Sequence, residues 1–250
     1  GLQHEDGDRH VMGAATPYCC SYDPTFAYEM AVIIQDGMTR MYEDQEAVCY
    51  YITMMNENYH QPAMPEGAED GIRRGMYRLQ KGGRGKKRVQ LMGSGTILME
   101  VIAAAELLKN DYGVDSDIWS CPSFTELRRD GIDCERHNLL HPQAEPRVPY
   151  VQQCLQGHDG PAVASTDYMR AFADQIRPYL DRHYVVLGTD GYGRSDTREN
   201  LRRFFEVDRY YIAVAALKAL ADEGTIESGQ VEKAIAQYKI DTDAPNPSTV

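Results

Sequence analysis

Residues 89–108 read VQLMGSGTILMEVIAAAELL, and this stretch decides the fold class. Its first four residues are short, largely apolar and bounded by a turn signal, which predicts a buried strand. The Gly-Ser-Gly that follows turns the chain, and apolar residues then recur at positions 97, 101, 104 and 108. That spacing places them on one face of a helix. The stretch therefore predicts a strand, a tight turn and a helix in succession.

The same alternation of strands and helices continues to the end of the chain. We predict strands at 117–120, 161–165 and 184–188, and helices at 125–136, 167–180, 196–205, 208–222 and 228–238. Asp196 and Glu199 have the spacing of a capping box for the helix that runs through Phe205. Strands that alternate with helices imply an α/β fold, with a mostly parallel sheet and helices on both faces. The polar tail from Asp241 is expected to fray.

The segment before this region has a different pattern. Residues 8–23 lack a clean period and are expected to form a loop. Pro24 suits the first turn of a helix, whose apolar residues from Phe26 to Met41 predict one buried stripe. Residues 47–53 predict a strand, and the polar, proline-containing stretch 56–67 predicts a domain boundary. A short helix is expected next, over about 67–79.

Composition excludes several classes of protein. The chain has 250 residues and a formal net charge of -12, which argues against nucleic acid or an anionic membrane as its main partner. No apolar run approaches the roughly 20 residues that span a bilayer, and no signal peptide is visible. The six cysteines form no CxxC pair, so we interpret them as reduced thiols in a cytoplasmic protein.

One stretch is strongly basic. Eight Arg and Lys residues lie between Arg73 and Arg88 with no acidic residue among them, and Lys81–Lys87 has the composition of a mobile turn. A solvated loop and a docking patch for an acidic partner both fit this pattern.

The chain opens with Gly1-Leu2-Gln3-His4-Glu5-Asp6-Gly7, which is typical of a loop lining a catalytic cleft. Glycines let such a loop approach a ligand, and His4 is its one side chain that titrates near neutral pH. His4 is the candidate catalytic residue, although a lone histidine also occurs as a structural one. Glu5 and Asp6 fit two interpretations equally, as groups that orient His4 or as solvated carboxylates.

Other candidate sites are weaker. Gly93-Ser94-Gly95 is interpreted as a tight turn, because it lacks the GxGxxG and P-loop patterns of phosphate sites. The loop Gly188–Asp196 follows a predicted strand, where α/β sheets bind ligands, but helix capping and subunit packing also explain it. His137 and His141 have the spacing of metal ligands on a helix, but no further ligand motif completes a site. We predict no metal site and no cofactor-binding residue on this chain.

Several long runs carry a family resemblance. With the opening GLQHEDG, they are residues 52–60 (ITMMNENYH), 62–71 (PAMPEGAEDG), 123–127 (SFTEL), 161–168 (PAVASTDY) and 187–196 (LGTDGYGRSD). The chain resembles the C-terminal part of the homodimeric type of pyruvate dehydrogenase over nearly all its length. The resemblance implies a transketolase-like C-terminal domain at 64–250, preceded by the end of a pyrimidine-binding domain at 1–63.

The resemblance also implies a function. The expected enzyme decarboxylates pyruvate with thiamine diphosphate and transfers the acetyl group to a lipoyl group of the dihydrolipoyl acetyltransferase component. His4 would lie beside the substrate, whereas the diphosphate and its Mg2+ would be held by segments absent from this chain. The segment alone is therefore expected to be inactive, and the chain is expected to be part of a homodimer. The alternatives are a dimerisation and docking module without catalytic residues and another thiamine-dependent enzyme related to transketolase.

Overall fold

The computed structural model describes residue 5 and residues 7–250, and its centre is a mixed sheet. Four of its strands are parallel, and one edge strand is antiparallel to its neighbour. The order of the strands is β3 (Tyr77–Gln80), β5 (Asp115–Ser120), β4 (Arg88–Gly93), β6 (Ala162–Ser165) and β7 (Tyr184–Leu187). The carboxyl ends of the parallel strands therefore meet at one edge of the sheet.

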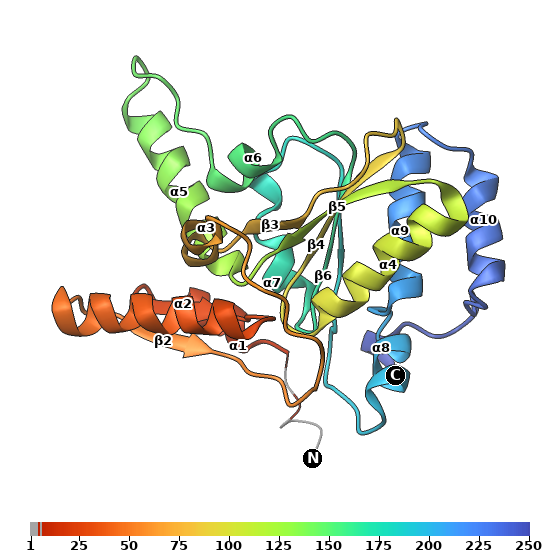
Figure 1. Ribbon diagram of the computed structural model, residues 1–250, viewed down its shortest axis with the longest axis horizontal. Coiled ribbons are helices and arrows are strands. Elements are labelled where there is room, and N and C mark those ends of the chain that lie inside the picture. Colours follow the sequence, from red (N-terminus) through yellow and green to blue (C-terminus); the bar gives the residue numbers. More distant parts are fainter. Residues whose placement is uncertain (1–4, 6) are drawn as a thin grey trace.

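Helices cover both faces of this sheet, as Figure 1 shows. One layer contains α4 (Ile97–Tyr112), α9 (Arg209–Asp222) and α10 (Ser228–Gln237). The opposite layer contains α5 (Phe124–Leu140), α6 (Tyr150–Leu155) and α7 (Arg170–Asp174). Separate apolar clusters fill the space between the sheet and each layer. The predicted α/β fold is confirmed, and the strand, turn and helix of residues 89–108 are β4 and α4.

An arm projects from this body (Figure 1). It consists of α1 (Arg9–Ala14), β1 (Cys19–Tyr22), α2 (Ala27–Met38) and β2 (Cys49–Ile52), with a π-helical turn, η2 (Thr39–Glu43), after α2. β1 and β2 form a separate parallel pair. The prediction of a loop over 8–23 is wrong, because β1 gains its pairing partner from a strand far along the sequence, which local periodicity does not reveal.

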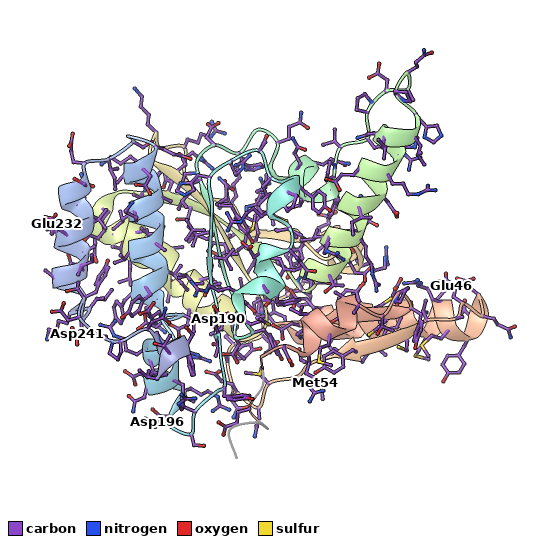
Figure 2. The ribbon with its side chains drawn as sticks, turned by 180° about the vertical axis from the view of Figure 1, so that it is seen from behind. Glu46, Met54, Asp190, Asp196, Glu232 and Asp241 are labelled. Carbon is purple, nitrogen blue, oxygen red and sulfur yellow. The ribbon has the colours of Figure 1, made fainter. Side chains whose placement is uncertain are left out.

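The predicted buried stripe of α2 is only partly buried. Phe26, Ile33 and Gly37 lie inside, but Ile34 and Met41 are exposed. Further exposed apolar side chains lie close by in sequence. They are Met38, Tyr42, Tyr51, Met54 and Met55, of which Met54 is 77% and Tyr42 74% exposed. Figure 2 shows the arm from behind, with Glu46 at its far end. We call this group of apolar side chains the arm face.

Two predicted helices end early for stereochemical reasons. The helix expected after residue 67 is α3 (Ala68–Arg74), and it stops at Gly75, whose φ of 96° suits glycine. A Cβ at Gly75 would lie 2.2 Å from the Ser123 carbonyl oxygen, so the chain turns there and forms β3. The helix expected over 167–180 breaks into α7 and a 3-10 turn, η3 (Arg177–Tyr179), because Pro178 cannot donate a backbone hydrogen bond.

The helix α8 (Arg198–Phe204) begins one residue later than its predicted cap. The hydroxyl of Thr197 accepts a hydrogen bond from Asn200 N at 3.3 Å, so Thr197 is the N-cap. Asp196 instead accepts from Thr197 N and from the Asn200 amide. The tail also differs from the prediction of fraying: it forms a 3-10 turn, η4 (Pro247–Thr249), and Arg194 donates to the Val250 carbonyl oxygen.

Candidate functional site

The residues immediately after four parallel strands meet in one buried polar cluster. Asp23 follows β1, Thr53 follows β2, Ser94 follows β4 and Thr166 follows β6. The Asp23 carboxylate accepts hydrogen bonds from Thr53 Oγ1 at 2.7 Å and from Ser94 Oγ at 2.8 Å. Ser94 Oγ lies 3.2 Å from Thr166 Oγ1. The cluster therefore joins the carboxyl edge of the two-stranded sheet to that of the larger sheet.

His10 of α1 extends this cluster. Its Nε2 lies 3.1 Å from Thr53 Oγ1 and its Nδ1 lies 2.5 Å from Ser21 Oγ. The ring stacks on Phe172 with a centroid separation of 4.5 Å and meets Tyr168 edge-on. This apolar enclosure disfavours the charged imidazolium, and burial lowers the pKa of His10 to about 4.

The protonation states in the cluster follow from these contacts. Because Thr53 donates its hydroxyl proton to Asp23, Nε2–H of His10 donates to Thr53, and Nδ1 accepts from Ser21. Burial raises the pKa of Asp23 to about 7, although the hydroxyls of Thr53 and Ser94 oppose that rise. At neutral pH the cluster therefore holds a neutral imidazole and a carboxyl group near its midpoint of titration.

The turn Gly93-Ser94-Gly95 is packed against this carboxylate. Gly95 has a φ of 51°, its N–H donates to the Asp23 carbonyl oxygen at 3.0 Å, and a Cβ there would lie 2.6 Å from Asp23 Oδ2. A diphosphate at this turn would face a carboxylate and find that amide already bonded. These residues do not fit a diphosphate group, and they form the tight turn that the sequence predicts.

A second buried carboxylate connects the arm to the sheet. Glu29 of α2 accepts from Thr25 N, Phe26 N, Tyr77 Oη and Ser120 Oγ at 2.5 to 3.0 Å. Burial raises its pKa in spite of these donors. Two of the four donors directly precede α2, one lies in β3 and one in β5, which indicates a structural role in which the start of α2 is fixed against both strands.

The loop Gly188–Asp196 binds the first described residues of the chain. Gly193 N donates to the Glu5 carbonyl oxygen at 2.7 Å, and Ser195 Oγ donates to Glu5 Oε1 at 3.0 Å. On the other side, Met169 N donates to the Gly7 carbonyl oxygen at 3.0 Å. Glu5 is thus bound to protein on one oxygen, whereas its Oε2 is buried and has no hydrogen-bond partner among the described residues.

The candidate catalytic residue His4 lies outside the described residues, as does Asp6. The contacts of Glu5 disagree with the interpretation of this side chain as a freely solvated carboxylate. The interpretation of the loop Gly188–Asp196 as a ligand-binding site is also weakened, because Asp190 pairs with Arg170 at 2.6 Å and Arg194 donates to backbone carbonyl groups.

A polar cavity of about 960 Å³ lies beside the same edge of the sheet. Arg202 pairs with Glu57 and, at 3.3 Å, with Glu100, and Arg209 holds Glu100 through two nitrogens at 2.9 and 3.0 Å. Burial alone would raise the pKa of Glu100, but the bonds from Arg209 outweigh it and hold the pKa below its usual value. Both arginines are paired with carboxylates, and the pair between Arg202 and Glu57 holds the segment around Glu57.

The basic stretch folds over two acidic residues of β5. Asp117 accepts from Gly82 N at 2.9 Å and from Arg88 at 2.5 Å, and Asp115 accepts from Gly85 N at 2.7 Å. The sequence predicts this turn to be mobile, but these bonds anchor it. The backbone amides of two glycines, Gly82 and Gly85, donate to the carboxylates. Burial raises the pKa of Asp117, but the bonds from Gly82, His158 and Arg88 outweigh it and lower the pKa to about 2.

Sequence reasoning missed most of these groups. Thr53, Ser94 and Thr166 are ordinary small polar residues, and the only available signal is that each directly follows a strand.

The ring centroids of His137 and His141 lie 4.4 Å apart at the exposed end of α5. Within the described residues there is no group of three or more His, Cys, Asp or Glu side chains that could hold a metal ion. No helix in that part of the chain is long and apolar enough to span a bilayer.

Comparison with known proteins adds an identity to this geometry. Residues 75–208 match the profile of the transketolase-like C-terminal domain, and residues 1–62 match that of the pyruvate dehydrogenase E1 component middle domain. The pyruvate dehydrogenase E1 component of Cupriavidus necator is 62% identical over 100% of the chain, and that of Escherichia coli K12 is 59% identical over 99%. The chain spans 28% of the length of each of these relatives.

Solved structures agree on the fold. A transketolase from Pichia stipitis superimposes with a TM-score of 0.62 at 16% identity, over 90% of this chain and 28% of its own. The transketolase from Leishmania mexicana gives 0.61 at 14% identity, over 98% of this chain and 29% of its own. The chain therefore belongs to the family of transketolase-like C-terminal domains, and it is similar over its whole length to pyruvate dehydrogenase E1 components.

Proposed function

We propose that this chain is part of a thiamine-diphosphate-dependent pyruvate dehydrogenase that decarboxylates pyruvate and transfers the acetyl group to the lipoyl group of an acetyltransferase component. The observation that carries the proposal is the identity of 62% over the whole chain with an enzyme of that name. The buried polar cluster at the carboxyl edge of the sheet supports it, since α/β sheets usually bind ligands at this edge.

We propose His4 as the residue of this chain that takes part in the chemistry. A histidine in that segment can donate a hydrogen bond to the carboxylate or carbonyl oxygen of pyruvate. It can also transfer a proton to the sulfur that leaves when the lipoyl disulfide opens. The bonds from Gly193 and Met169 to the neighbouring backbone would hold the segment in place for these roles.

The cofactor is proposed to be held by other segments of the enzyme. When bound, thiamine diphosphate supplies the electron sink for loss of carbon dioxide. The turn Gly93–Gly95 does not fit the diphosphate, and the family resemblance assigns the diphosphate and its Mg2+ to a different domain of the enzyme. The domain division at 63/64 is likewise a proposal, supported by the polar stretch around Pro62 and Pro65.

A second candidate function is dimerisation and partner docking without catalysis. The exposed apolar side chains of the arm favour it, because exposed apolar surface of this extent is typical of protein interfaces. The open two-stranded parallel sheet points the same way, since parallel sheets are normally buried on both faces. Both features are expected of a part that is completed by the rest of a longer chain and by a second copy.

Substrate specificity of the full-length protein tests the proposal. With thiamine diphosphate and Mg2+ present, we expect release of carbon dioxide from pyruvate and reduction of a lipoyl acceptor, without turnover of sugar phosphates. Turnover of sugar phosphates in place of pyruvate would identify a transketolase instead. Sedimentation of the full-length protein and of its Met54→Glu variant would show whether a charge placed in the arm face dissociates the dimer.

A further inference from the structure

We propose that the loop Gly188–Asp196 is a positioning element for the chain segment that carries His4, with Gly193 and Ser195 acting through Glu5. This inference rests on the proposed function, because it assigns the loop a role toward the proposed catalytic histidine. The loop begins at the carboxyl end of β7, so a strand of the central sheet fixes its start.

The contact at Glu5 involves both backbone and side chain. Gly193 N donates to the carbonyl oxygen and Ser195 Oγ donates to Oε1, so two bonds fix the residue that directly follows His4. The approach is close, because a Cβ at Gly193 would lie 3.0 Å from Glu5 Cβ and 3.2 Å from the Glu5 carbonyl oxygen. Only glycine at position 193 allows this distance without a shift of the segment.

A second contact fixes the segment on the other side of residue 6. Met169 N donates to the Gly7 carbonyl oxygen, and a Cβ at Gly7 would lie 3.1 Å from Met169 N and 3.2 Å from the Thr189 carbonyl oxygen. Thr189 N in turn donates to the Tyr168 carbonyl oxygen at 2.9 Å. Gly7 thus lies between the residues that follow β6 and β7.

The loop itself is braced from outside. The Asp190 carboxylate accepts from Arg170 N at 2.9 Å and from Arg170 Nε at 2.6 Å, and Arg194 donates to the Val250 carbonyl oxygen. Figure 2 labels Asp190 near the middle of the view and Asp196 at its lower edge, and the loop runs between them. A braced loop holds Glu5, Met169 holds Gly7, and misplacement of a catalytic group by about 1 Å can lower a rate by about a hundredfold.

The test uses variants of the full-length enzyme with saturating thiamine diphosphate and Mg2+. We expect Gly193→Ala to lower kcat about tenfold or more, and Ser195→Ala about threefold to tenfold, with KM for pyruvate changed less than about twofold. Ser195→Thr keeps the hydroxyl and should restore most of the rate. Gly229→Ala and Ser228→Ala are matched controls on α10, because nothing lies within 4 Å of a Cβ at Gly229 and Ser228 caps no helix.

A double-variant cycle separates positioning from a merely structural effect. If the loop acts through His4, Ser195→Ala should lower the rate by less than about twofold in a His4→Ala background. Equal losses in both backgrounds would overturn the inference, as would normal kcat for Gly193→Ala and Ser195→Ala in an enzyme that His4→Ala impairs. Full activity of His4→Ala itself would instead refute the proposed role of His4, so the two failures are distinguishable.

Discussion

Asp23 and His10 titrate in the same pH range with opposite effects on stability. The pKa of Asp23 is raised from 3.8 to about 7, so its contribution to the free energy of unfolding is full below pH 3.8 and is lost as the pH rises through 7. The pKa of His10 is lowered from 6.5 to about 4, so its contribution is present above pH 6.5 and is lost as the pH falls through 4. Between about pH 4 and 6.5, unfolding takes up a proton at His10 and releases one at Asp23. Their effects on the slope of the free energy of unfolding with pH therefore cancel.

The size of each contribution follows from the shifts. At 1.36 kcal/mol per unit, a shift from 3.8 to about 7 corresponds to about 4 kcal/mol for Asp23, and a shift from 6.5 to about 4 corresponds to about 3 kcal/mol for His10. As the pH rises from 4 to 7, the free energy of unfolding of the Asp23→Asn variant should therefore increase by about 4 kcal/mol relative to that of the wild type. As the pH rises from 4 to 6.5, that of the His10→Asn variant should decrease by about 3 kcal/mol relative to the wild type.

Urea unfolding of the 250-residue chain at a series of pH values measures these differences. Trp119 is the single tryptophan of the chain and is buried in the sheet, so its fluorescence reports unfolding of β5. The slope of each difference with pH matters, because either substitution also changes packing by a pH-independent amount. Two differences that are flat with pH, or that slope in the same direction, would refute the assignment of a neutral His10 beside a carboxyl group with a raised pKa.

Other predictions follow from single contacts. Glu29→Ala should destabilise the chain by about 3 kcal/mol in urea, because four buried donors lose their acceptor, and a loss below about 1 kcal/mol would contradict the structural role. The lowered pKa of Asp117 stabilises the fold above pH 3.8 and that gain is lost as the pH falls toward 2, so Asp117→Asn should lose about 2 kcal/mol at pH 7 and less at pH 2.5 in the same assay. Arg202→Met should speed proteolysis near Glu57, because it removes the ion pair that holds that segment, and an unchanged cleavage pattern would contradict this role. Calorimetric titration of the 250-residue chain with thiamine diphosphate and Mg2+ should show no binding, whereas tight binding would mean that the diphosphate site lies on this chain after all.

The sequence predicts the central sheet well because its signals are local. The β4–α4 unit is encoded by a short apolar run, a glycine turn and helical spacing, all within residues 89–108. The arm is different, since β1 exists only through its pairing with β2 and α2 leaves part of its apolar surface exposed. Local periodicity contains neither the distant partner of a strand nor the surface that a longer chain would cover.

The candidate site likewise has one part that the sequence predicts and another part that depends on distant contacts. The opening segment attracts attention because it combines a histidine with two glycines. By contrast, Asp23, Thr53 and Ser94 come together only because two sheets place their carboxyl ends side by side, which is a property of the assembled fold. The contact between Ser195 and Glu5 joins residues 190 positions apart, so no motif could have revealed it.

The rate of lipoyl reduction by the His4→Ala variant of the full-length enzyme tests the central claim most directly. We predict a loss of about a hundredfold or more with pyruvate and the natural lipoyl acceptor, because a positioned acid or base contributes about that much. Thiamine diphosphate affinity and dimer formation should stay unchanged in the same variant. Unchanged turnover would contradict the claim, and the chain would then be a dimerisation and docking part without catalytic residues of its own.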